Sequence, residues 1–234
     1  RARPAASPGP RGGLLKRVAR LVSRVGQGCR EHVEQLLSLA HAHWSGHGSA
    51  ELQTTCIGLV EELAVALPTE LSPQLDTLLP LLLGCIRDEG GATLPNARRA
   101  LGALVALSPC IAPFTAIVVP YVADTFDAAD APLELREEAL NVLSVLVAEH
   151  NLEPLASLVV LTLVRALGGE MQTQALGVLG VLARRLGPSY LAWEPSVRAA
   201  LRRYGVRDGA HDRLVAALMR QDVAEADAIA SVTS

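Results

Sequence analysis

Residues 170–204 read EMQTQALGVLGVLARRLGPSYLAWEPSVRAALRRY, and this stretch decides the fold. Its first half carries apolar residues at i, i+3, i+7 and i+10, which is one face of an α-helix: Leu176, Leu179, Ala183 and Leu186. Gly187 marks the end of that helix, and a second helix is expected over 190–204. The stretch therefore predicts a hairpin of two antiparallel helices.

The hairpin pattern recurs upstream at intervals of about forty residues. One series of small residues marks the first helices, with separations of 44, 39 and 36: Cys56, Ala100, Ala139 and Ala175. A second series marks the second helices, with separations of 40, 41 and 34: Pro80, Pro120, Leu161 and Pro195. Two markers with a shared period indicate an array of HEAT type. Glycines beside the first series predict close approaches of stacked first helices, with little room for a side chain: Gly58, Gly102 and Gly177.

The expected fold class is all-α, an α-solenoid of about five HEAT-type helical hairpins plus a terminal helix. The hairpins are predicted over 14–44, 49–87, 93–127, 132–167 and 170–204, and the terminal helix over 209–221. Residues 1–13 are expected to be a flexible lead-in and 222–234 a C-terminal tail, so that 14–221 form one array.

The composition agrees with a helical, core-forming chain. Of the 234 residues 50% are hydrophobic and only 3% are aromatic, which excludes overall disorder and argues against a β-sandwich or barrel. The four cysteines contain no CxxC pair, so we expect buried thiols in a reducing compartment: Cys29, Cys56, Cys85 and Cys110. Residues 100–123 are uncharged, but Pro109 and Pro113 interrupt them, which predicts two buried helices rather than a membrane span.

The net charge of −3 conceals an acidic middle between basic ends. Residues 184–220 hold eight basic and three acidic groups. Two interpretations are open: solvated helix faces, or a surface for an acidic protein partner. The candidate partner-binding residues are Arg198, Arg202, Arg203 and Arg207. Nucleic acid is not expected as a partner because few aromatic side chains are present to stack on bases.

No catalytic constellation or cofactor motif is recognised. The densest group of metal-ligand types does not match the spacing of a zinc finger or of HExxH, so exposed helix-end and loop histidines are the preferred interpretation: Cys29, His32, His41, His43 and His47. The acidic pairs at 61–62 and 137–138 are interpreted as solvated faces of amphipathic helices. No phosphate loop, GxSxG, HRD or DFG appears, so we expect a chain without catalytic residues, metal or cofactor.

Ordered landmarks resemble the HEAT-repeat region of the target-of-rapamycin (TOR) Ser/Thr protein kinase family. Residues 126–133 (FDAADAPL), with Arg136 and the pair at 139–140, resemble the family's FDAPEAPL-x-x-R-x-x-AL segment. Residues 163–167 (LVRAL) resemble the family's IVRTL. Its pattern LG-x-x-Y-x-x-x-x-P-x-V is matched by Leu186, Gly187, Tyr190, Pro195 and Val197. Its VALGGEF…LPQLIP stretch is matched in outline by residues 65–67 and 75–80. The similarity spans residues 14–220 and departs near His211, where the family's HQRYD keeps only its Asp; this leaves the packing of the last helix open.

The resemblance implies a noncatalytic scaffold segment of a TOR-like kinase, without the kinase domain. Such a segment supports dimerisation of the full-length protein and docks complex subunits in growth and nutrient signalling. The implied partners are those subunits and neighbouring HEAT repeats, and the implied location is the cytoplasm, including endomembrane surfaces reached through partners.

Two alternatives belong to other classes. One is a free-standing HEAT-repeat adaptor of the transport-receptor or phosphatase-scaffold kind. The other is a HEAT-like enzyme subunit that uses the histidine cluster as a metal site.

Overall fold

The computed structural model describes residues 10–44, 50–87 and 93–233. The described residues form helices and short connections, with no β-strand among them. They divide into two compact units, one of residues 1–114 with 131–138 and one of residues 115–130 with 139–234. The all-α solenoid class predicted from the sequence is confirmed, since consecutive helical hairpins stack within each unit.

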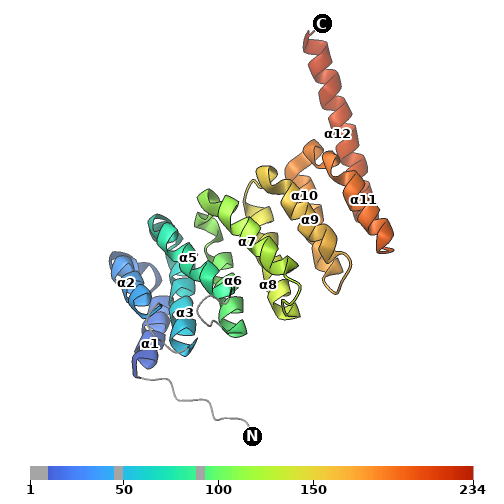
Figure 1. The fold of residues 1–234 in the computed structure, drawn as a ribbon. Helices are drawn as coiled ribbons and strands as arrows, with labels where there is room; N and C mark the ends of the chain where they lie inside the picture. Colours follow the sequence, from blue (N-terminus) through green and yellow to red (C-terminus); the bar gives the residue numbers. More distant parts are fainter. Residues whose placement is uncertain (1–9, 45–49, 88–92, 234) are drawn as a thin grey trace. The chain divides into compact units, whose positions relative to one another are not determined.

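Unit 1 contains three first helices and two second helices of the hairpin pattern (Figure 1). The first helices are α1 (Pro10–Val25), α3 (Ala50–Ala66) and α6 (Leu94–Ala106). The second helices are α2 (Val33–Trp44) and α5 (Leu75–Ile86), preceded by the short helices η1 (Gly26–His32), α4 (Pro68–Leu71) and η2 (Ser72–Gln74). First helices pack on one another, α1 on α3 and α3 on α6, while α2 packs on α3 and α5 on α6.

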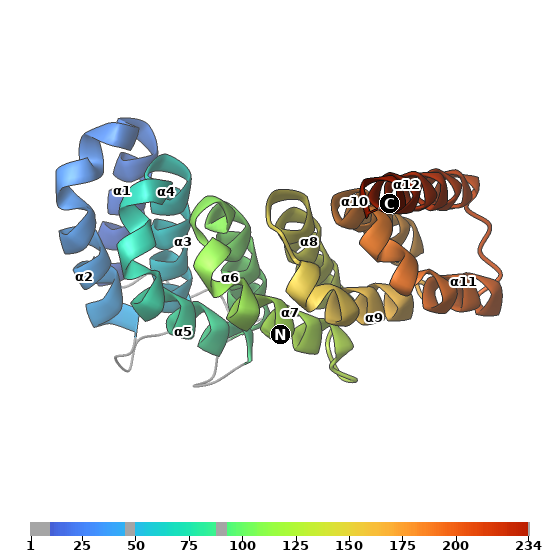
Figure 2. The same ribbon diagram turned by 90° about the horizontal axis from the view of Figure 1, so that it is seen from above.

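Unit 2 repeats this pattern (Figure 2). Its second helices are α7 (Thr115–Asp127), α9 (Ala156–Ala166) and α11 (Glu194–Arg203). Its first helices are α10 (Gln172–Leu186), α12 (Gly209–Thr233) and the part of α8 (Leu133–Glu149) from residue 139 onward. The 3-10 helix η6 (Gly187–Ala192) joins α10 to α11. In this unit α7 packs on α9, α9 on α10 and α12 on α10.

Leucine and alanine fill the core, as the amphipathic stripes require. Leu63 of α3 and Leu101 of α6 are fully buried in unit 1, as are Leu163 of α9 and Leu179 of α10 in unit 2. Burying each such leucine contributes about 1.5–3 kcal/mol. No helix in the described part of the chain has the length and apolar character needed to cross a bilayer.

The ends of the chain differ from the sequence-based expectation. Helix α1 begins at Pro10, inside the stretch predicted to be a lead-in, and residues 1–9 lie outside the described part. Helix α12 continues to Thr233, so the residues predicted to be a tail are largely helical. Pro80 and Pro120 lie inside α5 and α7.

The glycine prediction is wrong at two of three positions. A Cβ on Gly177 would meet nothing within 4 Å, and one on Gly102 would lie 3.8 Å from Oε1 of Glu61. Only at buried Gly58 is space short, because a Cβ there would lie 2.7 Å from Nη2 of Arg99. The glycine of α3 thus makes room for an arginine side chain reaching across from α6, and not for a neighbouring backbone.

Polar ties between neighbouring hairpins supplement the apolar contacts in both units. In unit 1 the Arg98 guanidinium lies 3.2 Å from a Glu138 carboxylate oxygen, and Arg30 lies 2.7 Å from Glu70. In unit 2 Trp193 Nε1 donates a hydrogen bond of 3.1 Å to Ser157 Oγ. Exposed ion pairs of this kind contribute about 0–1 kcal/mol each, so they fix register more than they add stability.

A buried amide makes a further tie between hairpins, through three hydrogen bonds. Asn96, in the first turn of α6, is completely buried. Its Nδ2 donates to the Ala50 carbonyl at 3.0 Å and to Gln53 Oε1 at 2.7 Å, while its Oδ1 accepts from the Thr54 hydroxyl. Because a buried amide without partners costs about 1–3 kcal/mol, this network specifies how α6 sits on α3.

Candidate interaction surface on the last hairpin

The four candidate arginines all belong to unit 2 and lie at its α11 end. Arg198, Arg202 and Arg203 lie on α11, and Arg207 lies in the connection to α12. All four side chains are exposed, as a partner-binding surface requires.

The local sequence explains why α11 presents them outward. Pro195 stands in the first turn, where its missing amide hydrogen costs nothing. Val197 and Leu201, at i and i+4, are buried in unit 2. Arg198 and Arg202, each one residue further on, are turned about 100° away from that apolar face and reach solvent.

Two of the four arginines contact other side chains of unit 2. Arg198 forms an ion pair with the buried Glu194 carboxylate one turn earlier. The Arg203 guanidinium lies 5.6 Å from the Tyr204 ring centroid, in cation–π range. Among the described residues Arg202 and Arg207 have no ion-pair partner. The unneutralised positive charge of the surface therefore lies on Arg202, Arg203 and Arg207, because contact with a neutral ring does not cancel the charge of Arg203.

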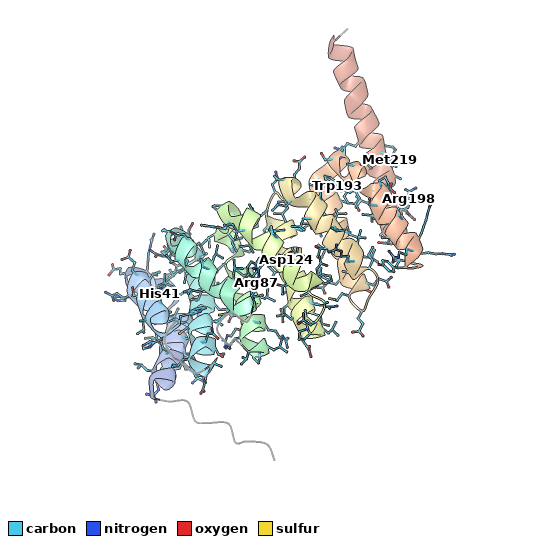
Figure 3. All side chains as sticks on the ribbon, viewed as in Figure 1. His41, Arg87, Asp124, Trp193, Arg198 and Met219 are labelled. Carbon is cyan, nitrogen blue, oxygen red and sulfur yellow. The ribbon has the colours of Figure 1, made fainter. Side chains whose placement is uncertain are left out.

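A groove of about 610 Å³ opens between α11 and α12 beside these arginines. Its apolar wall is formed by Leu201, Val206, Val215, Ala216 and Met219, and its charged residues are Arg198, Arg202, Arg207, Asp208 and Asp212. Figure 3 shows Arg198 and Met219 on the two helices that border it. We call this feature the α11/α12 groove. Arg203 does not line it, so the structure brings together three of the four predicted residues.

A buried pair that the sequence did not indicate anchors α12. The hydroxyl of Tyr190, in η6, lies 3.0 Å from Nε2 of His211 on α12, and both side chains are buried. Burial, and secondarily the Glu194 carboxylate, raises the pKa of Tyr190, so its phenol keeps its proton. The departure from the family pattern near His211 left the packing of the last helix open. The structure shows that His211 attaches α12 to the preceding hairpin through its contact with Tyr190.

A second groove, of about 450 Å³, lies in unit 1 between α3, α6 and the start of α8. Both of its arginines are paired: Arg98 with Glu138 at 3.2 Å and Arg99 with Glu61 at 3.3 Å. These pairs leave the exposed Glu134 and no unpaired positive charge in the lining of the groove. The acidic pairs at 61–62 and 137–138 thus each contribute one carboxylate to an ion pair between helices.

The candidate metal ligands are distributed along η1 and α2. Cys29 and His32 lie in η1, His41 and His43 lie in the last turn of α2, and His47 falls outside the described residues. In the part that the structure describes, no three His, Cys, Asp or Glu side chains come close enough to hold an ion. The four cysteines are free and buried, as expected. Burial raises the pKa of the Cys56 thiol to about 11.

Three of the relatives found by comparison with known proteins are Ser/Thr protein kinases. The chain is 26% identical over 204 residues to the Serine/threonine-protein kinase mTor of Drosophila melanogaster. The aligned region covers 86% of this chain and 8% of that kinase. It is 23% identical over 218 residues to the Serine/threonine-protein kinase tor1 of Schizosaccharomyces pombe, and this region covers 92% of the chain and 9% of that kinase. It is 23% identical over 211 residues to the Serine/threonine-protein kinase TOR2 of Saccharomyces cerevisiae, and this region covers 89% of the chain and 8% of that kinase.

The resemblance predicted from the ordered landmarks is therefore confirmed, since these homologues are TOR kinases matched along most of this chain. The chain spans less than a tenth of the length of each of them. No family model matches the sequence.

Proposed function

We propose that this chain is a noncatalytic scaffold segment of a TOR-like Ser/Thr protein kinase. In this proposal residues 14–221 act as one repeat array that supports dimerisation and docks the subunits of a kinase complex in growth and nutrient signalling. The supporting observation is the similarity to three TOR kinases along 86–92% of this chain. The proposed location is the cytoplasm, including endomembrane surfaces reached through partners.

A noncatalytic role is supported by what the side chains do. Glu61 and Glu138, interpreted from the sequence as parts of solvated helix faces, form ion pairs with arginines of α6 across hairpins. A carboxylate neutralised by a fixed ion pair is poorly suited to accept a proton from a substrate. The same contacts are useful to a scaffold because they set the register of consecutive hairpins.

The proposed docking surface is the basic end of unit 2, with an acidic protein surface as its complement. Arg202, Arg203 and Arg207 carry the charge that is free to attract it, because among the four arginines only Arg198 forms an ion pair within the described residues. Charge complementarity of this kind accelerates association and weakens with added salt.

The decisive experiment is immunoprecipitation of the native protein with an antibody raised against this chain. We expect a polypeptide much larger than 24.7 kDa and Ser/Thr kinase activity in the precipitate. The 234-residue chain by itself should neither bind ATP nor transfer phosphate. A native polypeptide of the chain's own size, free of kinase activity, would refute the proposal and favour a free-standing HEAT-repeat adaptor.

A second experiment separates a scaffold from a catalytic role within the large polypeptide. Leu179→Asp places a carboxylate in the core of α10, whereas Leu161→Asp places one at a position 46% exposed on α9. We expect the core change to reduce co-purification of other subunits while the kinase retains activity on a short peptide. The exposed change is the control for the added charge. Loss of peptide phosphorylation in parallel with loss of subunits would contradict the separation of roles.

A further inference from the structure

Three neighbouring first helices of unit 1 present charges of alternating sign around the groove of about 450 Å³. We call it the α3/α6/α8 groove. Each helix shows a set of residues at i, i+3 and i+4, which share one helix face. The charged members are glutamates on α3, arginines on α6 and glutamates again on α8. The sets are Gly58, Glu61 and Glu62; Pro95, Arg98 and Arg99; and Glu134, Glu137 and Glu138.

The ion pairs across this surface leave an excess of negative charge. Arg98 and Arg99 are bound to one glutamate each, on opposite sides of α6. Three further glutamates of the same helix faces have no ion-pair partner within the described residues: Glu62, Glu134 and Glu137. Five glutamates against two arginines give the surface a net charge of −3. Of the unpaired carboxylates, Glu134 lines the groove itself.

The groove also has an apolar part that is open to solvent. Leu94 and Pro95, in the first turn of α6, line it, and Leu94 is 38% exposed. Gly102, one turn after Arg98 on the same helix face, lines it as well. A Cβ on Gly102 would lie 3.8 Å from Oε1 of Glu61, so a longer side chain would project into the groove. The glycine therefore keeps this space free.

An exposed apolar patch beside an unpaired carboxylate suits the side chains of lysine and arginine. Their aliphatic stems cover apolar surface, while their charged heads reach a carboxylate and form a charge-assisted hydrogen bond. Nucleic acid and phospholipid headgroups carry phosphate and are repelled by a surface of this sign. Among the described residues no three carboxylates converge closely enough to hold a metal ion, so the charge is spread along the surface. Such a distribution matches a segment that carries several cations.

We propose that the α3/α6/α8 groove docks a basic segment of a protein partner. A lysine or arginine of that segment covers Leu94 and pairs with Glu134, and further basic residues face Glu62 and Glu137. The inference goes beyond the proposed function, which assigns docking to the basic end of unit 2 and an acidic partner surface. It also holds for a chain that is not part of a kinase.

The charge of the groove is tested with two thiol reagents of opposite charge. Leu94→Cys is made in the full-length native polypeptide, which is stripped of partners at high salt and returned to low salt. Its modification rates by a cationic and an anionic methanethiosulfonate are compared, and other thiols are accounted for in the unaltered protein. Leu161→Cys, at a position of α9 that is 46% exposed, corrects for the intrinsic reactivities.

We expect the ratio of cationic to anionic rate to be about threefold or more higher at Leu94→Cys than at Leu161→Cys, and to fall with added salt. The paired change Glu134→Gln and Glu137→Gln should lower that ratio towards the control value. Glu170→Gln, at an exposed residue of unit 2 outside the groove, should leave it unchanged.

The occupant is tested by photo-crosslinking in the intact native assembly. A benzophenone side chain replaces Leu94, and the same group in place of Leu161 is the control. We expect the group at residue 94 to crosslink to a different polypeptide, at a segment rich in lysine and arginine that mass spectrometry locates. Glu134→Lys with Glu137→Lys should lower the crosslinking yield about tenfold or more, since like charges then face each other. Glu170→Lys should not change it.

Four results would overturn the inference. Equal reagent ratios at the two cysteines would mean that the groove has no excess negative potential. Absence of a crosslink from residue 94 would mean that solvent alone covers this face. A crosslink to a second copy, or to a segment without basic residues, would assign a different occupant. An unchanged yield with Glu134→Lys and Glu137→Lys would remove the role of charge. None of these results depends on kinase activity in the precipitate, so failure of this inference and failure of the proposed function are distinguishable.

Discussion

Replacing Gly177 by alanine should stabilise unit 2. Gly177 lies within α10, is exposed, and has open space where a Cβ would project. Glycine inside a helix costs about 1 kcal/mol relative to alanine, and no steric term opposes the gain here. We therefore expect Gly177→Ala to raise the free energy of unfolding by about 1 kcal/mol. For a chain of this size that corresponds to about 2–4 °C in Tm.

The assay follows unit 2 alone. Of the two tryptophans, Trp44 lies in unit 1 and Trp193 in unit 2, so a Trp44→Phe background leaves Trp193 as the reporter. Urea unfolding followed by its fluorescence should show a midpoint raised by about 0.3–1 M, given slopes of about 1–3 kcal/mol per molar.

Gly58→Ala is the matched control, followed by circular dichroism because it lies in unit 1. Its Cβ would lie 2.7 Å from Nη2 of Arg99, so Arg99 must move and its 3.3 Å pairing with Glu61 is disturbed. We expect a smaller gain than at Gly177, or none. A loss of stability in Gly177→Ala would refute the reasoning, since it would mean that the backbone of α10 requires a glycine for a reason other than space.

Three further predictions concern the core and the basic surface. Tyr190→Phe removes the hydroxyl that His211 contacts and should destabilise unit 2 by about 1–3 kcal/mol, measured by the same urea titration, because a buried imidazole is left without its partner. Burial raises the pKa of Cys56 from 9.0 to about 11, so the fold favours the neutral thiol; the contribution of Cys56 to stability should be constant below pH 9 and be lost as the pH rises from 9 to 11. Burial also raises the pKa values of Cys85, Cys110 and Tyr190, so Cys56→Ala should lessen the alkaline fall in urea midpoints without abolishing it. The paired change Arg198→Glu and Arg202→Glu should leave the circular dichroism spectrum unchanged, yet weaken assembly of the full-length complex in a salt-dependent manner when co-purification is compared at two ionic strengths; unaltered assembly at both would mean that the arginines only contact solvent.

Most of the helices could be predicted from the periodicity of the sequence, because a helix that buries one face must place its apolar residues at a regular spacing. The stripe of α10 and the apolar positions Val197 and Leu201 of α11 needed no knowledge of neighbours. The glycines of α6 and α10 were misjudged for the opposite reason. Whether a Cβ fits depends on what another hairpin places opposite it, and at Gly177 nothing is there.

The candidate site was predictable in part. Four outward arginines followed from helix geometry and charge counts, but their unequal availability did not. That Arg198 is held by Glu194 could have been suspected from the i,i+4 spacing, whereas the cation–π contact of Arg203 depends on how the chain turns at Tyr204. The partnership of Tyr190 with His211 joins residues 21 apart across a turn and has no signature in spacing.

The polar ties between hairpins also bear on how the chain acquires its structure. Arg98 and Glu138 are 40 residues apart in the sequence, Arg99 and Glu61 are 38 apart, and Trp193 and Ser157 are 36 apart. Each tie therefore closes a loop of about one repeat, and adding repeats lengthens the chain without lengthening any loop. Since closing long loops is what slows folding, the rate should depend on the single repeat and not on the size of the polypeptide. A nascent chain consolidates each hairpin once the next one has emerged from the ribosome, before synthesis of the remaining repeats is complete.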